Sequence, residues 1–549
     1  MKKWKILTEA PTKLTPENLF KILLKNRGIE TKKEVDEFIN GKLGDVIPEN
    51  VGIKIPQIKK TIKRIDEAIA KNQKIIIYGD YDVDGITGTA ILWETIYSFY
   101  PNVAPYIPHR IDEGYGLSVK GVENILEQNI EVGLIITVDN GIVAFDAVEF
   151  ANQKNIDVVI SDHHVPSKKL PVCYALVHTT KLCGAGVAYL LAKEILKERK
   201  TKIKNEHLDL VALATVADLV PLTGANRILL KEGLKILNKT TRPGLTELFR
   251  EGGITPEKIG VYEIGHVIGP RLNASGRMEH ALDSLRLLCT KDRARARELA
   301  QKLGVTNKDR QVLTQETTAA ASLISEKLIK NEKIIFVYDK KYNQGIIGLV
   351  ASRLVEKHYK PSIVVSVGEK VSKGSARSIT GFNIIEYLRS FPTFLSEAGG
   401  HPMAAGFTIE TEKLLEFKKA IEIEAHAKIK DELLTKTILV DLELEFGQIN
   451  LALHKELQRL APFGMANPEP SFVSRRITVR SVRTVGKDSK HLQLMLEKDG
   501  NLISAIAFGL AEEKPVAAGS VIDALYTIDN NVWREKEKLQ LKIKDLEVV

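Results

Sequence analysis

The sequence predicts a multidomain α/β protein with a parallel sheet, a second α/β domain and a C-terminal β-barrel. Three short apolar runs, KIIIYGD, LIITVDNG and DVVISDHH, alternate with helical patterns, which is typical of buried parallel strands. A long charged stretch without proline predicts a helix between two domains. Later segments such as RRITVRSVRTV and HLQLMLE alternate in polarity, which favours an all-β module.

These patterns divide the chain into five predicted segments. They are a basic helical region (1–70), an α/β domain (71–290), a connecting helix (291–330), a second α/β domain (331–434) and an OB-like β-barrel (435–549). A chain of 549 residues is far longer than one hydrophobic core supports, so several domains are expected.

The individual elements follow in order along the chain. Thr15 before Pro16 indicates a helix start, and residues 55–70 form a lysine-rich amphipathic pattern. Helices are expected from about Thr87, after the first apolar run, and from about Phe145, after the second. The second α/β domain begins at KIIFVYD and carries two glycine-containing segments, GSARS and GGHPMAAG, which we expect to be loops.

Composition argues against a membrane-spanning protein and against a disulfide framework. A hydrophobic share of 44% is ordinary, and no apolar run is long enough to cross a bilayer. The first twenty residues lack the apolar stretch of a secretory signal. Cys173, Cys183 and Cys289 form no CxxC pair, which fits a reducing compartment. We therefore expect a cytoplasmic protein.

The net charge of +9 is modest, but it is distributed in patches. Residues 1–74 hold 17 Lys and Arg against 10 Asp and Glu, and residues 291–330 hold 9 against 5. Basic patches suit a polyanionic partner, although solvated helix faces give the same pattern.

Polar residues lie at the carboxyl ends of the three apolar runs, where ligands of open parallel sheets bind. They are Asp80, Asp82 and Asp84 after the first run, Asp139 after the second, and Asp162, His163 and His164 after the third. Asp218 ends an apolar helical stretch before Pro221 and is a further candidate.

Together these side chains predict a divalent-metal site. Several carboxylates on one rim repel one another unless a cation lies among them. Oxygen and nitrogen ligands without thiolates fit Mn²⁺ or Mg²⁺ better than structural zinc. Two ions would need a bridging carboxylate, and Asp139, alone at its strand end, is our candidate for it. Taken singly, acidic turns after strands and histidine pairs on a packed surface are common.

The motifs GDYDVDG, VDNG, SDHH and VADLVPL resemble, in order and spacing, the four motifs of the DHH phosphoesterase superfamily. GIIGLVASRL, GSARSITGF and GGHPMAAGF resemble its associated C-terminal domain, and the β module after Leu434 is similar to that of the RecJ family of single-strand-specific exonucleases. The resemblance covers nearly the whole chain.

The resemblance implies roles for individual residues. The metal-binding positions match Asp80, Asp82, Asp84, Asp139, His163 and Asp218, and the catalytic set would be Asp82, Asp84, Asp139, His163 and His164. His164 would lie beside the scissile phosphate, and Asp162 would orient its neighbours. The substrate-binding positions match Arg110, Arg271, Asn273, Arg277, Ser375, Arg377 and His401. Arginine forks and glycine-rich backbone suit phosphate, while surface ion pairs and plain turns are the ordinary alternatives.

Two positions depart from the family pattern. Tyr78 occupies a position where many superfamily members carry histidine, so metal affinity or preference is expected to differ. The segment YNQGIIG lacks the His-Pro expected in this loop.

The size of the chain favours a polymeric substrate over a small one. The resemblance implies 5′-to-3′ exonuclease action on single-stranded DNA, with mononucleotide products and roles in repair and recombination. The alternatives are a small-nucleotide or oligoribonucleotide phosphodiesterase and a non-enzymatic scaffold.

The predicted β-barrel gives partial support for strand binding. Residues 435–549 hold 16 basic and 16 acidic residues, but the basic ones cluster between Arg475 and Lys490. The aromatic residues considered for base stacking are Phe472, Phe508, Tyr526 and Trp533. Docking of a partner protein is the alternative role for this module, and a helicase or a single-strand-binding protein is a candidate partner. The chain could work as a monomer.

Overall fold

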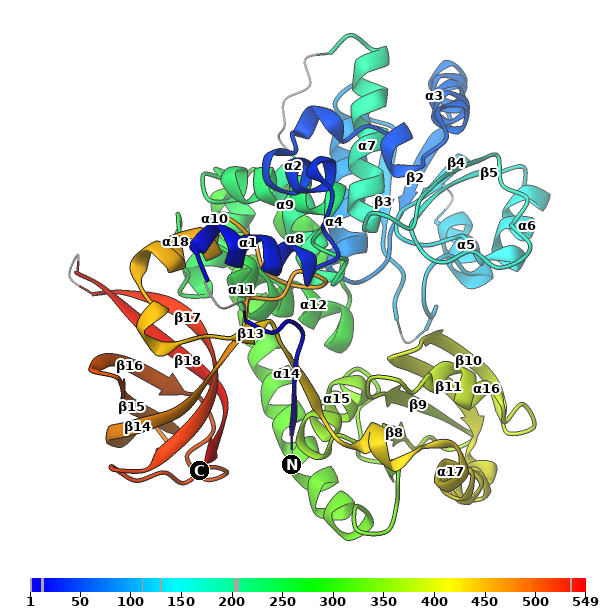
Figure 1. The fold of residues 1–549 in the computed structure, drawn as a ribbon. Coiled ribbons are helices and arrows are strands. Elements are labelled where there is room, and N and C mark those ends of the chain that lie inside the picture. Colours follow the sequence, from blue (N-terminus) through cyan, green and yellow to red (C-terminus); the bar gives the residue numbers. More distant parts are fainter. Residues whose placement is uncertain (1, 11–13, 111, 129–130, 202–206, 534–535) are drawn as a thin grey trace. The chain divides into compact units, whose positions relative to one another are not determined.

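The computed structural model describes residues 2–10, 14–110, 112–128, 131–201, 207–533 and 536–549 (Figure 1). The chain divides into two compact units. Unit 1 comprises residues 47–218 and 232–436, and unit 2 comprises residues 2–46, 219–231 and 437–549.

The first sheet of unit 1 is fully parallel, as predicted, with strand order β3-β2-β4-β5-β6. Its strands are β2 (Lys74–Tyr78), β3 (Val103–Tyr106), β4 (Val132–Thr137), β5 (Asp157–Asp162) and β6 (Ala175–His178). The associated helices are α3 (Ile55–Ala70), α4 (Val83–Tyr97), α5 (Val119–Glu127), α6 (Phe145–Gln153) and α7 (Gly184–Glu198), and a short 3₁₀ turn, η2 (Glu49–Val51), precedes α3.

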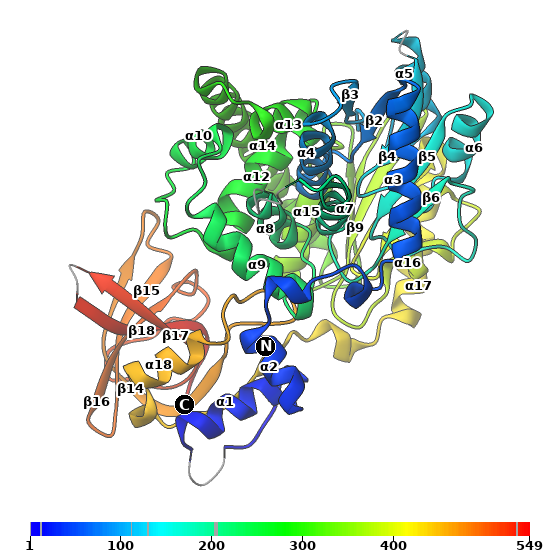
Figure 2. The ribbon, with the colours of Figure 1, turned by 90° about the horizontal axis from the view of Figure 1, so that it is seen from above.

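Helices cover both faces of this sheet, which explains its uninterrupted apolar strands. Figure 2 shows α5 and α6 on one side and α3, α4 and α7 on the other. On the α5–α6 side, Ile76, Ile135 and Val158 of the strands pack against Val122 of α5 and Val148 of α6. Helix α4 begins at Val83, four residues before the predicted start, because the Asp82 side chain caps it.

A helical layer follows the sheet and leads into one long helix. Its elements are α8 (Leu208–Ala217), α9 (Gly224–Leu237), α10 (Pro243–Glu251), α11 (Val261–Glu263), the π-helical turn η3 (Ile264–Ile268), α12 (Gly269–Met278) and α13 (Leu282–Cys289). Helix α14 (Arg293–Leu328) then runs for 36 residues, within the stretch predicted to be a connecting helix.

The second sheet of unit 1 has the order β10-β11-β9-β8-β7. Its elements are β7 (Ile335–Asp339), α15 (Ile347–His358), β8 (Ser362–Ser366), β9 (Val371–Arg377), α16 (Ile384–Arg389), β10 (Leu395–His401), β11 (Ala404–Glu410), η4 (Thr411–Lys413), α17 (Leu414–Lys428) and η5 (Asp431–Leu434). Strands β7 and β8 are parallel, and the remaining pairs are antiparallel.

The prediction that GSARS and GGHPMAAG are loops was wrong. GSAR lies in β9, and GGHPMAAG forms the end of the β10–β11 hairpin. Small residues are needed because the strands and their side chains approach closely: a Cβ at Gly374 would lie 2.1 Å from the Phe407 ring. Small residues at close strand contacts therefore give the same sequence signal as a turn.

Unit 2 contains a five-stranded barrel closed by pairing of β14 with β17. Its elements are β1 (Lys3–Ile6), α1 (Pro16–Lys25), α2 (Lys32–Asn40), η1 (Leu43–Asp45), β12 (Thr437–Val440), β13 (Leu442–Glu443), η6 (Phe446–Gln448), α18 (Leu451–Gln458), β14 (Phe472–Val485), β15 (His491–Lys498), β16 (Asn501–Ala507), β17 (Val521–Trp533) and β18 (Lys536–Val548).

The predicted N-terminal region 1–70 is divided between the two units. Strand β1 pairs in parallel with β12, and Leu19 and Leu23 of α1 join the core of the barrel unit. Helix α3 instead lies against the first sheet of unit 1 and buries Ile58 and Ile65. Pairing between residues more than 430 positions apart has no local sequence signal, so the prediction missed it.

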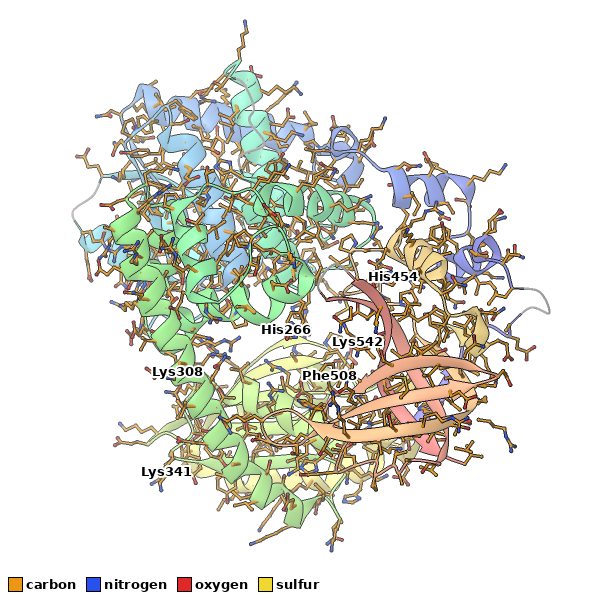
Figure 3. The ribbon with its side chains drawn as sticks, turned by 90° about the vertical axis from the view of Figure 1, so that its left-hand side faces the viewer. His266, Lys308, Lys341, His454, Phe508 and Lys542 are labelled. Carbon is orange, nitrogen blue, oxygen red and sulfur yellow. The ribbon has the colours of Figure 1, made fainter. Side chains whose placement is uncertain are left out.

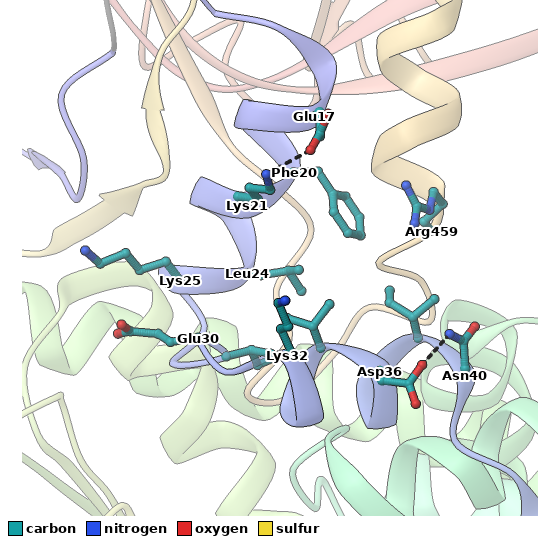
Figure 4. Close-up of a pocket in the computed structure, with 13 residues that line it drawn as sticks. Glu17, Phe20, Lys21, Leu24, Lys25, Glu30, Lys32, Asp36, Asn40 and Arg459 are labelled. Carbon is teal, nitrogen blue, oxygen red and sulfur yellow. Dashed lines mark hydrogen bonds and ion pairs between the residues drawn. The ribbon is translucent and has the colours of Figure 1, made fainter.

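Unit 2 carries a groove of about 640 Å³ between α1, α2 and the Arg459 side chain. Figure 4 shows Phe20 and Leu24 inside the groove and charged side chains at its rim. The Arg459 guanidinium lies over the Phe20 ring, 4.3 Å from its centroid. Charged side chains thus border an apolar surface formed by two N-terminal helices.

A buried ion network fastens α4 to the helical layer of unit 1. Arg242 donates to both carboxylate oxygens of Glu94, at 2.7 and 3.1 Å, and His207 lies 3.0 Å from the same carboxylate. Burial opposes ionisation, but hydrogen bonds from His207 and charge from Arg242 lower the pKa of Glu94 to about 2. Ionised Glu94 therefore stabilises the fold.

We expect Glu94→Gln to destabilise unit 1 by about 2–4 kcal/mol, because it removes the carboxylate that pairs with both terminal nitrogens of the buried Arg242 and leaves only Asp209, 3.5 Å from its Nε. The loss should be full near pH 7. It should shrink as pH falls from the ordinary value of 4.5 toward 2, where Glu94 itself becomes protonated. Urea unfolding midpoints measure it. Glu194→Gln, which removes an ion pair with the exposed Lys197, is the control and should cost under about 1 kcal/mol. Equal effects of the two changes would contradict this account.

Candidate metal centre and phosphate pocket

The predicted acidic residues meet at the carboxyl edge of the first sheet. Strands β2, β4 and β5 are neighbours, and their parallel register sets Tyr78 beside Thr137. Asp80 and Asp139 each lie two residues beyond these positions, and Asp162 ends β5. The three strand ends therefore deliver their polar side chains to one place, as the sequence predicts.

Helix N-termini orient two of the carboxylates. Asp82 accepts hydrogen bonds from the backbone N–H groups of Asp84, at 3.0 Å, and Gly85, at 3.1 Å. Asp84 accepts from Gly184 N–H at 2.6 Å and Ala185 N–H at 2.7 Å, at the start of α7. These amides and the helix dipole offset part of the buried negative charge. A Cβ at Gly184 would lie 2.6 Å from the Asp139 Cβ, so the close approach requires glycine.

Three groups of side chains have ligand atoms within 4.8 Å of one another. The groups are Asp80, Asp82 and Asp139; Asp84, His163 and Asp218; and Asp139, His163 and His164. His163 Nε2 lies 3.0 Å from Asp139 Oδ1 and 3.7 Å from oxygens of Asp84 and Asp218. Asp139 and His163 each belong to two groups, so they connect the whole cluster.

Asp139 has an unusual backbone conformation. Its φ of +64° lies in the left-handed region, which costs an ordinary residue about 1 kcal/mol and which Asp and Asn tolerate best. Its N–H donates to the Ser161 carbonyl at 3.0 Å, which holds the residue between β4 and β5. The fold thus aims the Asp139 side chain at the centre of the cluster.

Several ligand atoms in the cluster are buried without a hydrogen-bond partner among the described residues. They are both carboxylate oxygens of Asp80, Oδ1 of Asp139 and Nε2 of His163. Orphaned buried acceptors are costly, and a divalent cation satisfies oxygen and imidazole ligands together. The residues present therefore fit the metal predicted from the sequence.

Burial and mutual repulsion also change the acidity of these carboxyl groups. Burial, followed by the charges of neighbouring aspartates, raises the pKa of Asp80 and of Asp139 well above the ordinary value. The same two causes raise the pKa of Asp218 to about 9. Without a cation, the cluster therefore holds protons at neutral pH.

Asp162 forms hydrogen bonds with its neighbours and belongs to none of the three ligand groups. Its carboxylate accepts from the N–H groups of Ile142, His163 and His164, at 2.9, 2.7 and 3.1 Å, and from His164 Nδ1 at 2.8 Å. Burial opposes ionisation of Asp162, but the hydrogen bond from His164 lowers its pKa. On the other side of the ring, His164 Nε2 lies 2.9 Å from the Tyr115 hydroxyl. The His164 ring is thus held from both nitrogens.

An arginine-rich pocket of about 850 Å³ adjoins the cluster within unit 1. Arg110, Arg277, Ser375 and Arg377 line it, as does Tyr115. Burial, together with the neighbouring arginines, lowers the pKa of Arg277 to about 10. The described residues offer no ion pair to Arg110, Arg277 or Arg377, so the pocket fits an anion.

The second sheet brings its predicted residues to the same place. Arg377 donates to the Ser375 hydroxyl at 3.1 Å and to the Ala376 carbonyl at 2.9 Å, which fixes its guanidinium. The His401 ring, from the β10–β11 hairpin, lies parallel to His164 with ring centroids 6.4 Å apart. Side chains from both sheets therefore surround one cavity and the metal edge.

Two predicted substrate-binding residues have other contacts. Asn273 accepts from the Val83 N–H at 3.0 Å, so its oxygen binds the start of α4. Arg271 donates to the Val267 carbonyl at 3.0 Å, and its buried Nε lacks a partner among the described residues. Neither residue lines the arginine-rich pocket. A substrate role for them stays a prediction.

Sequence reasoning missed three pocket residues. Tyr81 lies under the Arg110 guanidinium, 5.2 Å from its ring centroid, and Tyr115 contacts His164. Lys373 of β9 also lines the pocket. Tyr81 and Tyr115 belong to the motifs GDYDVDG and PHRIDEGYG, so their position beside motif residues was the available signal.

Tyr78, the departure from the family pattern, is a core residue. Its ring is fully buried and stacks on Tyr106 with centroids 5.1 Å apart, and its hydroxyl donates to the Gly116 carbonyl at 3.2 Å. The Tyr78 side chain is thus packed and hydrogen-bonded in the core of the domain. The expected change in metal preference stays a prediction.

Comparisons with known families agree with this geometry. The DHH family, N-terminal domain, matches residues 74–215; the DHHA1 domain matches 331–426; and the RecJ OB domain matches 440–545. The chain is 35% identical to a Bacillus subtilis protein named single-stranded-DNA-specific exonuclease RecJ, covering 100% of this chain and 70% of that one. The chain belongs to the RecJ family.

Other RecJ proteins extend the match to full length. The Haemophilus influenzae RecJ is 31% identical, with 96% of each chain covered, and the Escherichia coli RecJ is 30% identical, covering 98% and 97%. The crystal structure of Thermus thermophilus RecJ in complex with Mn²⁺ matches with a TM-score of 0.83 and 28% identity, covering 99% of this chain and 79% of that one. Among the described residues, no helix is long and apolar enough to span a membrane.

We expect metal binding to release protons. Asp218, with a pKa of about 9, is protonated at pH 7, and a cation that binds its carboxylate must displace that proton. Mn²⁺ affinity should therefore rise from pH 6 to pH 8. Calorimetric titration in two buffers of different ionisation enthalpy measures both effects. Affinity independent of pH, with no proton release, would contradict the assignment.

Proposed function

We propose that this chain is a metal-dependent exonuclease that hydrolyses single-stranded DNA from the 5′ end to 5′-mononucleotides, in DNA repair and recombination. The observation that carries the proposal is the juxtaposition of an acidic, divalent-metal-compatible cluster with a pocket whose three arginines have no ion pair among the described residues. RecJ relatives carry single-stranded-DNA-specific exonuclease in their names, and solved RecJ structures contain Mn²⁺ or Mg²⁺. These names favour a polymer over a small nucleotide.

The metal ligands in this proposal are the six residues that the sequence suggested. Asp80, Asp82, Asp84, Asp139, His163 and Asp218 would hold two ions of Mn²⁺ or Mg²⁺, with Asp139 between them. When bound, such ions supply the Lewis acidity that activates water and offsets charge at the scissile phosphate. The number of ions is part of the proposal.

The remaining residues hold the substrate. Arg110, Ser375, Arg377 and His401 would bind the 5′-terminal phosphate, because guanidinium forks and a hydroxyl match its oxygens. A phosphate held there sets the reacting bond beside His164, whose ring Asp162 and Tyr115 fix. Binding of a chain end explains exonuclease rather than endonuclease action.

The barrel of unit 2 supplies a further basic surface. Arg475 and Arg480 form ion pairs with Asp523 and Glu497, while Lys487 extends from the exposed turn between β14 and β15. Of the aromatic residues considered, Phe472 and Tyr526 are core residues, and Phe508, labelled in Figure 3, is 58% exposed. The Trp533 side chain lies outside the described residues. We propose that the Lys487 turn and Phe508 contact the strand.

Cleavage direction is tested with two 40-nucleotide single strands, labelled at the 5′ or the 3′ end, in Mn²⁺ and then in chelator. The proposal predicts immediate release of labelled mononucleotide from the 5′-labelled strand alone, no release in chelator, and no digestion of a blunt duplex. Hydrolysis of dinucleotides without degradation of either strand would favour the small-nucleotide phosphodiesterase instead.

The variant Asp139→Asn tests the metal cluster without straining the backbone, because asparagine tolerates the left-handed conformation. It should reduce cleavage by more than about 100-fold while sparing strand binding, since loss of a central ligand removes several kcal/mol of transition-state stabilisation. The exposed Asp146, at the start of α6, gives the control Asp146→Asn. Unchanged cleavage by Asp139→Asn would rule out this cluster as the catalytic one.

The variant Lys487→Gln tests strand binding by the barrel. If Lys487 contacts a phosphate, the slope of log affinity against log salt should fall by about 0.7, the value for one contact on a single strand. Fluorescence anisotropy across a salt series measures it, with Lys419→Gln on the exposed side of α17 as the control. An unchanged slope would favour a protein-docking role for the module.

Partners and location complete the proposal. We propose that a helicase or a single-strand-binding protein supplies the strand, and that the chain acts as a monomer in the cytoplasm.

A further inference from the structure

Among the tyrosine, phenylalanine and tryptophan side chains that the structure describes, Tyr262 is the most exposed, with 65% of its surface accessible. Its ring stacks on His266, four residues later, with ring centroids 4.5 Å apart and an interplanar angle of 17°. His266 Nδ1 donates to the Tyr262 carbonyl at 3.2 Å, which fixes the second ring. An exposed, pre-stacked ring pair is a ready surface for a third flat group.

The backbone beneath this pair is also unusual. Residues Ile264–Ile268 form a π-helical turn, η3, between α11 and α12. Single π-turns inside helices are frequent at functional sites, because their cost must be offset elsewhere. Here the turn sets Tyr262 and His266 one above the other on the solvent side, while Ile264 and Ile268 are fully buried.

The ring pair belongs to a segment that leads to the proposed active site. The η3 turn packs against the end of α8: Cβ atoms at Gly265 and Gly269 would meet Val216 and Ala217 at 3.8 and 3.9 Å. The residue after Ala217 is Asp218 of the metal cluster. Figure 3 shows His266 at the edge of the helical layer of unit 1.

The same helical segment continues to the arginine pocket. From His266 to Arg277 the chain advances 11 residues, or about 16 Å at helical rise, and Arg277 lines the pocket. Between them lies Arg271, whose buried Nε lacks a partner among the described residues. Glu263, the acidic residue next to Tyr262, accepts from the Gly260 N–H at 2.8 Å, so its charge is partly offset. The segment therefore combines aromatic faces and positive charge.

We propose that Tyr262 and His266 form a stacking platform for a nucleobase of the single strand, several nucleotides from its 5′ end. The inference rests on the proposed function and adds a strand contact outside the metal cluster and the phosphate pocket. A base stacked on the exposed face of Tyr262 holds the strand without reading its sequence, because every base has a flat face. The platform therefore strengthens the binding of long strands and does not change the affinity for short ones.

The test compares wild type, Tyr262→Ala and Tyr262→Phe in binding a 3′-labelled, 5′-phosphorylated 20-nucleotide strand and a trinucleotide of the same form. Anisotropy in chelator measures affinity without cleavage. Tyr262→Ala should weaken binding of the 20-nucleotide strand about 5- to 100-fold and leave trinucleotide binding unchanged, while Tyr262→Phe, which keeps the ring, should bind both as wild type does.

A strand with abasic sites at positions three to eight from the 5′ end supplies the second arm of the test. Wild type should bind this abasic strand as weakly as Tyr262→Ala binds the intact strand. Tyr262→Ala should bind the abasic and the intact strand equally. The matched control is Tyr97→Ala, which removes an exposed tyrosine that also pairs with an aromatic residue four positions away, Trp93. It should bind both strands as wild type does.

Equal binding of the 20-nucleotide strand by wild type and Tyr262→Ala, or equal loss on both substrate lengths, would overturn the platform. The proposed function fails in a different way: the wild type would bind the strand through Tyr262 yet release no nucleotide with Mn²⁺.

Discussion

The repulsion among buried carboxylates at the carboxyl edge of the first sheet is the constraint on which the rest of the structure depends. Asp80, Asp84 and Asp139 are almost completely buried, and this burial, together with the charge of the neighbouring Asp82, raises the pKa of each. Such a cluster is stable only when protons or cations compensate it. The catalytic role that we propose for these carboxylates therefore requires a cation among them.

The surrounding fold meets this constraint with several separate devices. The N-terminus of α7 donates two amide N–H groups to Asp84, and the strained backbone of Asp139 aims its carboxylate at the centre. Asp218 follows the end of α8, and the two histidines follow the end of β5. These elements come from positions spread over about 140 residues, so the cluster exists only in the folded domain.

The arginine pocket is the electrostatic counterpart of the acidic cluster. Burial, followed by the charge of Arg110, lowers the pKa of Arg277 and of Arg377, and a bound anion would compensate this positive charge as a cation would compensate the carboxylates. A phosphodiester with bound metal supplies both charges at once. Substrate and metal binding are thus expected to support each other.

The sequence was most informative where local pattern and chemistry coincide. The apolar runs before Asp80, Asp139 and Asp162 predicted the parallel strands, because buried strands read as continuous β-branched segments. It was least informative where distant segments meet: the pairing of β1 with β12 and the closure of the barrel by β14 and β17 leave no local trace. Small residues in β9 resembled a turn, and the cap formed by Asn273 needed the fold to be seen.

The location of Mn²⁺ in crystals of this protein, seen by anomalous scattering at the manganese edge, tests the central claim most directly. The account predicts one peak among Asp80, Asp82 and Asp139 and a second among Asp84, His163 and Asp218, with Asp139 between the two peaks. Peaks only at other positions, or an intact cluster without any ion at saturating Mn²⁺, would contradict it.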